Sequence, residues 1–143
     1  MIRKYDEKDL EALLDVWYQA ALVAHSFLEE AFFEEERLNI RDVYMPVSDT
    51  WVYEDAGRVV GFISMSENEV GGIFVYPEWQ GRGIGRALMD VAKGLHETLE
   101  LEVFKENLKA RGFYEQYGFV AYGERPFEKT GDMLVRMRFV SKT

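Results

Sequence analysis

The sequence predicts an α/β fold with elements in the order β-α-α-β-β-β-α-β-α-β-β. Segments with strand character alternate with segments of helical periodicity along the chain. Residues 70–95 pass directly from a strand through a glycine-rich turn into a helix. The chain has 143 residues, of which 48% are hydrophobic, and this is enough to bury one substantial core. We therefore expect a single domain over residues 1–143.

The first fifty residues are predicted to contain a short strand and two helices. Residues 1–4 form the strand. A first helix is expected from about Glu7 to Ala24, because apolar residues recur there at helical spacing, namely Leu10, Leu13, Leu14, Trp17, Ala20, Ala21 and Ala24. A second helical region should extend from about Glu29 to Tyr44 and end near Pro46, since a proline disfavours helix in the residue before it.

Three strands are expected next. Residues 51–53 and 59–64 are rich in β-branched and aromatic side chains and flank a turn at residues 54–57, which predicts a hairpin. Residues 70–76 form a third such run, which is closed by Pro77.

The glycine-rich turn at residues 80–85 is the most informative segment. A helix begins within it, because apolar residues recur at helical spacing after it: Ala87, Leu88, Val91, Ala92 and Leu95. A turn between a strand and a helix N-terminus presents free backbone N–H groups and the positive end of the helix dipole. Glycine lets an anion approach this backbone closely. The segment therefore predicts a site for a pyrophosphate group.

Spacing distinguishes three phosphate-binding motifs. A P-loop requires Lys followed by Ser or Thr after its last glycine, but Arg and Ala follow Gly85. A dinucleotide-binding motif requires Gly-x-Gly-x-x-Gly, whereas the glycines here are spaced Gly-x-Gly-x-Gly. Glu102 does lie about 20 residues further on, where that motif has its ribose-binding acid. However, the turn lies past the middle of the chain, and too little sequence follows to complete such a sheet.

The remaining residues are predicted to form a strand, a short helix and two more strands. Residues 99–103 alternate apolar and acidic side chains, which is typical of a strand. The short helix carries Phe113 and Tyr114. Residues 119–123 and 133–139 form the last strands.

Two motifs resemble those of the GNAT superfamily of acyl-CoA-dependent N-acetyltransferases. Gln80, Gly83 and Gly85 match Gln/Arg-x-x-Gly-x-Gly/Ala, the third phosphate-binding motif. Residues 107–119 match the later signature Asn-x-x-Ala-x-x-Phe-Tyr-x-x-x-Gly-Phe, at the spacing typical of the family. The resemblance implies a mixed, mostly antiparallel sheet flanked by helices. It also implies that the sheet splays between the strand ending at Tyr76 and the strand at residues 99–104.

The same resemblance implies that acetyl-CoA binds in this opening. The cofactor-binding residues expected from it are Ile73, Phe74 and Val75 for the pantetheine arm, Gly81, Arg82, Gly83, Ile84, Gly85 and Arg86 for the pyrophosphate, and Asn107. In the family the strand before the turn uses its backbone, and one of its N–H groups polarises the thioester carbonyl. Asn is also a favoured N-cap, so Asn107 is expected to begin a helix as well.

Tyr114 is the candidate general acid, because it holds the position of the tyrosine in the later signature. A phenol with an ordinary pKa of about 10 is protonated at neutral pH and can donate to a thiolate whose conjugate acid has a pKa of about 8.5. Tyr117 lies one helical turn further on, and we expect it to be a packing residue.

The general base and the acceptor site are expected in two other segments. Glu67 and Glu69 enter the strand that contacts the thioester, so either one is a candidate base, acting directly or through water. The segment that contains His25 and Phe27 resembles the His-x-Phe-Leu element of small bacterial GNAT enzymes. In these enzymes the first two helices form a wall of the acceptor site. His25 and Phe27 are therefore predicted to bind the substrate, and His25 is a further candidate base.

Composition limits the partners. Residues 1–50 hold 12 acidic and 5 basic side chains, and the whole chain has a net charge of −9. This charge disfavours nucleic acid as a partner and favours a cationic amine, either a protein lysine or a small molecule. Cysteine is absent, the two histidines are far apart in the chain, and acetyl transfer needs no metal, so no metal site is expected. No membrane span or signal peptide is apparent, so the expected location is cytoplasmic, as a monomer or homodimer. The alternative is a non-catalytic acyl-CoA-binding regulatory module.

Overall fold

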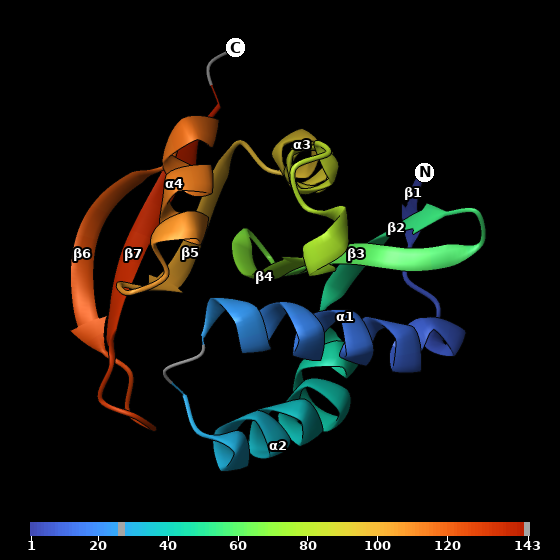
Figure 1. Ribbon diagram of the computed structural model, residues 1–143. Coiled ribbons are helices and arrows are strands. Elements are labelled where there is room, and N and C mark those ends of the chain that lie inside the picture. The colour runs from blue at the N-terminus through green and yellow to red at the C-terminus, as the bar shows by residue number, and fades with distance from the viewer. Residues whose placement is uncertain (26–27, 142–143) are drawn as a thin grey trace.

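The computed structural model describes residues 1–25 and 28–141. Its seven strands form one mixed sheet in the order β1-β2-β3-β4-β5-β7-β6 (Figure 1). The strands are β1 (Ile2–Lys4), β2 (Asp49–Asp55), β3 (Arg58–Ser66), β4 (Glu69–Val75), β5 (Thr98–Phe104), β6 (Val120–Pro126) and β7 (Met133–Val140). The helices are α1 (Leu10–Ala24), α2 (Glu30–Asn39), α3 (Ile84–Leu95) and α4 (Leu108–Tyr117). All neighbouring strands are antiparallel except β4 and β5. The predicted fold class is confirmed.

Two predicted helices have irregular ends. The first begins as a 3₁₀ turn, Glu7–Asp9, before α1, and Asp6 caps this turn by accepting a hydrogen bond from the Lys8 N–H at 3.0 Å. The second is α2 followed by a π-helical turn, Ile40–Tyr44, and then a 3₁₀ turn that contains Pro46. The helical region therefore ends near Pro46 as predicted, but Met45 keeps helical backbone angles although it precedes the proline, and the last turn continues to Val47.

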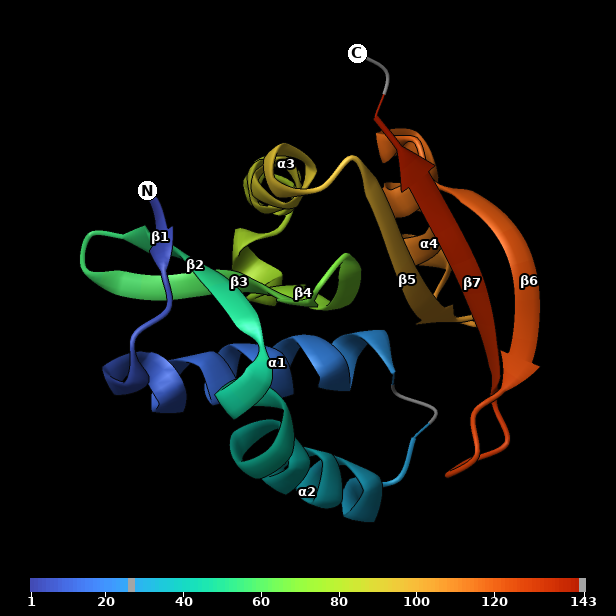
Figure 2. The ribbon, with the colours of Figure 1, turned by 180° about the vertical axis from the view of Figure 1, so that it is seen from behind.

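The sheet opens between β4 and β5. These parallel strands pair at only two positions, Glu69 with Glu100 and Val70 with Leu101, and then diverge (Figures 1 and 2). By contrast, β5 and β7 stay paired along their whole length. The part of β4 beyond Val70 consequently lacks a neighbouring strand on one edge. Backbone groups on that edge are available to another partner.

Helices cover both faces of the strands beside the opening. α1 and α3 both contact β3 and β4, and they lie on opposite sides of these strands (Figures 1 and 2). The largest fully buried side chains come from α1, β2, β3, α3, β5 and β7, and include Leu13, Val52, Ile63, Leu88, Met89, Leu99, Leu101 and Met137. Burial of this apolar surface fixes the angle at which the two halves of the sheet diverge. No helix within residues 1–25 and 28–141 is both long and apolar enough to cross a membrane.

Candidate active site

A cavity of about 1100 Å³ occupies the opening between β4 and β5. Its walls include the end of α1, parts of α2, β3, β4 and β5, the glycine-rich turn, α4, and the connection between β6 and β7. Pockets for a single small ligand usually measure roughly 300–1,000 Å³. The cavity is therefore large enough for two substrates to meet.

The glycine-rich turn forms one end of the cavity. Gly81 and Gly83 have φ angles of +80° and +83°, which side chains other than glycine rarely adopt, and Gly83 is the N-cap of α3. The backbone N–H groups of Gly83, Ile84, Gly85 and Arg86 have no hydrogen-bond partner among the described residues. Four unpaired donors at a helix N-terminus suit a pyrophosphate group.

The free edge of β4 forms the floor of the opening. The Tyr76 N–H donates to the Val60 carbonyl of β3 at 3.0 Å. Because successive residues of a strand direct their backbone groups to opposite edges, Phe74 also faces β3, whereas Ile73 and Val75 face the opening. The N–H groups of Ile73 and Val75 and the Ile73 carbonyl are thus presented to an extended ligand, in the manner of one more strand, whereas the Val75 carbonyl already accepts a hydrogen bond from the Gln80 side chain.

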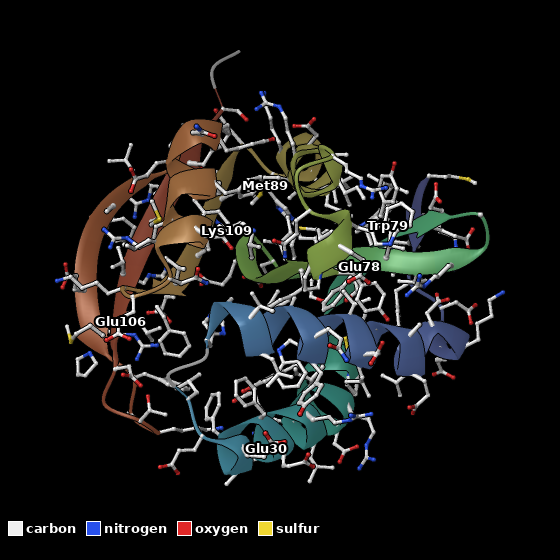
Figure 3. All side chains as sticks on the ribbon, in the orientation of Figure 1. Glu30, Glu78, Trp79, Met89, Glu106 and Lys109 are labelled. Carbon is white, nitrogen blue, oxygen red and sulfur yellow. The ribbon has the colours of Figure 1, made fainter. Side chains whose placement is uncertain are left out.

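Gln80 and Lys109 connect the two sides of the opening. The Gln80 side chain donates from Nε2 to the Val75 carbonyl at 3.0 Å, and Lys109 donates from Nζ to Gln80 Oε1 at 2.5 Å. Lys109 lies on α4 beside the opening (Figure 3) and lines the cavity, as Arg86 does. Lys109 was not among the predicted site residues, although it is the third residue of the later signature, which begins at Asn107. The positive charges of Lys109 and Arg86 make this end of the cavity suitable for an anion.

Tyr114 lies on α4 with its ring buried against Phe113 and Phe119, and it lines the same cavity. Burial raises the pKa of its phenol above the ordinary value of about 10, so the hydroxyl stays protonated at neutral pH. No hydrogen bond of this hydroxyl occurs with any described residue. The Tyr117 hydroxyl instead donates to Asp90 at 2.6 Å. Tyr117 therefore has a hydroxyl that is already hydrogen-bonded, whereas the Tyr114 hydroxyl makes no hydrogen bond with a described residue.

Asn107 joins the start of α4 to the end of α1 across the cavity wall. It is buried, and it caps α4 by accepting a hydrogen bond from the Ala110 N–H at 3.1 Å, as its residue type predicts. Its Nδ2 lies 3.2 Å from Nε2 of His25, at the end of α1. Because an amide nitrogen only donates, His25 Nε2 accepts in this pair, which requires a neutral imidazole.

His25 forms part of the cavity wall, and its ring meets the Phe104 ring edge-on at 5.0 Å. Burial lowers the pKa of the His25 imidazole from 6.5 to about 4. A base this weak is poorly matched to an ammonium group with a pKa near 10. The position of His25 on the cavity wall consequently suits its predicted role in the substrate pocket. Its lowered pKa argues against the predicted alternative, in which His25 is the direct base.

The lowered pKa of His25 predicts a specific loss of stability in acid. The unfolded chain binds a proton at this residue near pH 6.5, and the folded chain binds it only near pH 4. The contribution of the neutral His25 imidazole to the unfolding free energy is therefore complete above pH 6.5 and is lost as the pH falls toward 4. Between pH 7 and pH 4.5 the unfolding free energy of the wild type should fall about 2 kcal/mol more than that of His25→Gln. Urea unfolding at several pH values measures this difference. Parallel curves for the two proteins would contradict the prediction.

The structure places most of the other predicted site residues on the cavity wall. The cofactor-binding candidates that line it are Ile73, Phe74, Val75, Gly81, Gly83, Ile84, Gly85, Arg86 and Asn107. Arg82 does not line it, since its guanidinium stacks on Trp79 at 4.6 Å and donates to the Glu78 carbonyl at 3.3 Å. Both partners lie on the short connection after β4 (Figure 3). Phe27, predicted to bind substrate, lies outside the described residues.

The two predicted carboxylate bases lie away from the cavity wall. Glu67 is in the turn between β3 and β4, with a φ of +54°. Glu69 accepts hydrogen bonds from both terminal nitrogens of Arg136, at 2.8 and 3.2 Å. Neither side chain lines the cavity, so the geometry does not support direct contact with a bound amine. The predicted route through a chain of water molecules is the one compatible with these positions.

The splayed sheet and the glycine-rich turn at its opening define an acetyltransferase fold. The family model described as an acetyltransferase (GNAT) domain matches residues 14–141. Peptidyl-lysine N-acetyltransferase YiaC of Escherichia coli (strain K12) is 34% identical over 120 residues, which cover 83% of this chain and 82% of the relative. The chain belongs to the GNAT acetyltransferase family, a class of acyltransferases.

Solved structures agree with this assignment. The solution structure of apo-form YjaB from Escherichia coli is similar with a TM-score of 0.88 and 26% identity, covering 99% of this chain and 98% of that one. The PaiA N-acetyltransferase from Thermoplasma acidophilum, solved in complex with coenzyme A, has a TM-score of 0.77 at 19% identity, again covering 99% and 98%. The second structure shares the fold.

Proposed function

We propose that this protein transfers the acetyl group of acetyl-CoA to a primary amine by direct attack in a ternary complex. One observation carries the proposal: the unpaired amides of the glycine-rich turn, the free edge of β4 and the Tyr114 hydroxyl all border a single cavity. An anion site, an extended-ligand site and a proton donor are what binding of acetyl-CoA and departure of its thiolate require. The coenzyme A in the similar PaiA structure supports the choice of donor.

Each part of the cavity has a role in this mechanism. The amides from Gly83 to Arg86 hold the pyrophosphate, with Lys109 and Arg86 adding positive charge. The backbone groups of Ile73 and Val75 hold the pantetheine arm, and an N–H of this edge polarises the thioester carbonyl. As the carbon–sulfur bond breaks, Tyr114 donates its proton to the departing sulfur. Asn107 keeps α4 in place and so positions Tyr114.

The acceptor is proposed to be a protein lysine. The related YiaC protein is named a peptidyl-lysine N-acetyltransferase, and the net charge of −9 favours a cationic acceptor. The ammonium must lose its proton before attack, and Glu69 or Glu67 is proposed to receive it through water. Substituting each of them with Gln, and comparing how the turnover number depends on pH, identifies which carboxylate is involved.

Thermal unfolding with and without millimolar acetyl-CoA tests the donor. A ligand at about 100 times its Kd adds about 2.7 kcal/mol to stability, so the Tm should rise by roughly 5–10 °C. If the Tm does not move, the proposed cofactor site is wrong.

An assay of thiol release separates the enzyme from the alternative, a non-catalytic acyl-CoA-binding module. We expect a lysine peptide to accelerate the release of coenzyme A by the wild type. A Tm shift without any acceptor-dependent release across a panel of peptides and small amines would favour the binding module.

A further inference from the structure

The two ends of the cavity differ in charge. Arg86 and Lys109 are the cations that line it within the described part of the chain, and both lie at the end formed by the glycine-rich turn and α4. The acidic residues that line it are on α2, on β5 and just after β5: Glu36, Glu102 and Glu106. The first end suits an anionic cofactor. The second end suits a cation, and its acids are therefore the ones to examine for acceptor selection.

The three acids differ in how they are placed. Glu102 is bound by both nitrogens of the Arg125 fork at 2.5 and 2.7 Å, so its charge is already compensated. Glu106 is exposed to solvent near the start of α4 (Figure 3), where water screens its charge. Glu36 has a side chain only 15% exposed, and it sits on the wall among aromatic residues of α2. Of the three, Glu36 combines burial with an incompletely compensated charge.

The partner of Glu36 is itself a lysine. Lys129, in the connection between β6 and β7, places its Nζ 3.6 Å from Glu36 and 3.7 Å from Glu35. Charge-assisted hydrogen bonds measure about 2.7–2.9 Å, so these contacts are long. The Lys129 side chain is 37% exposed, and an ion pair that is partly open to solvent in this way stabilises the fold only weakly. A competing ammonium can therefore displace it at little cost.

The connection that carries Lys129 also closes the cavity at this end. The Phe127 ring lies 5.9 Å from Phe32 of α2 and 5.6 Å from Phe104 of β5, edge-on to both. A lysine that enters the cavity beside these packed rings loses water from its ammonium, and the loss is unfavourable unless a carboxylate lies on the path. Glu36 provides that carboxylate.

On the basis of the proposed function, we infer that Glu36 is a specificity-determining residue that binds the ammonium of the incoming lysine. In the free protein, Lys129 pairs with Glu36 and competes with that ammonium. Glu36 acts before deprotonation and takes no part in the chemical step. Its substitution should therefore change the KM for the acceptor and leave kcat unchanged.

Equilibrium binding of a short capped peptide with one lysine tests this inference without relying on turnover. Glu36→Gln should weaken binding about tenfold, and Lys129→Ala should strengthen it severalfold. In the double variant, the gain from Lys129→Ala should disappear. A matched peptide with norleucine in place of lysine should bind the wild type and Glu36→Gln equally.

Glu35→Gln is the matched control, because Glu35 is adjacent, also contacts Lys129, and has a side chain 65% exposed. It should leave peptide binding unchanged. Equal binding by Glu36→Gln and the wild type, an equal loss in Glu35→Gln, or no preference of the wild type for lysine over norleucine would each overturn the inference. Unfolding curves of every variant verify folding, and Glu36→Asp provides a second charged variant that should retain part of the affinity.

Failure of the role of Glu36 can be distinguished from failure of the proposed function. Failure of catalysis appears as absent thiol release even though the peptide binds. Failure of the inference appears as peptide binding, or an acceptor KM, that does not respond to Glu36.

Discussion

Replacing Tyr114 with phenylalanine should lower kcat about 100-fold while acetyl-CoA binds with unchanged affinity. The substitution removes only the hydroxyl, and the ring that packs against Phe113 and Phe119 remains. Burial keeps the phenol protonated, so in the wild type the proton is available to the leaving thiolate. Steady-state kinetics with a lysine peptide measures kcat, and the Tm shift with acetyl-CoA measures cofactor binding.

Tyr117→Phe is the control for this prediction. Tyr117 is on the same helix, one turn further on, and its hydroxyl is engaged with Asp90. We expect kcat within about twofold of the wild type, since the packed ring is kept and the hydroxyl that is removed is bound to Asp90. Full activity of Tyr114→Phe would remove Tyr114 from the mechanism, and an equal loss in both variants would indicate a general disturbance of α4.

Replacing Gly85 with valine should weaken acetyl-CoA binding more than about 100-fold. A Cβ at this position would already lie 3.4 Å from the Phe113 ring, and both residues line the cavity, so the larger valine side chain crowds the wall beside the unpaired amides. Displacement of the pyrophosphate from two charge-assisted hydrogen bonds, worth about 1.5–3 kcal/mol each, accounts for this loss. Calorimetric titration with acetyl-CoA measures it.

Gly94→Val is the matched control, because Gly94 is on the same helix and a Cβ added there would meet no described atom within 4 Å. It should bind acetyl-CoA as the wild type does. Gly83→Val, which also follows from the sequence motif, is a less selective test, because the φ of +83° strains any β-branched residue and the variant therefore loses stability as well. Normal acetyl-CoA affinity of Gly85→Val would contradict the assignment of the turn to the cofactor.

The sequence, with the family resemblance of its two motifs, was sufficient to predict the fold class. The period of the apolar residues predicts α1 and α3, and Gly81 and Gly83 occur where the backbone takes positive φ angles before the helix N-terminus. These are local properties, determined by neighbours in the chain. For the same reason Asn107 could be predicted as the cap of α4, a role that the structure confirms.

The opposite end of the cavity depends on residues that are distant in sequence. The contact of His25 with Asn107, 82 residues apart, and the pairing of Lys129 with Glu36 leave no periodic signal in the chain. The candidate bases show the same limitation: the position of Glu69 in the strand suggested access to the thioester, whereas packing of β7 beside β5 brings Arg136 to bind it. The sequence thus determined the elements and the glycine-rich turn, because backbone conformation is local. Only the tertiary structure decided which side chains surround the opposite end of the cavity, because that depends on how helices and strands from both ends of the chain pack around the divergence of β4 and β5.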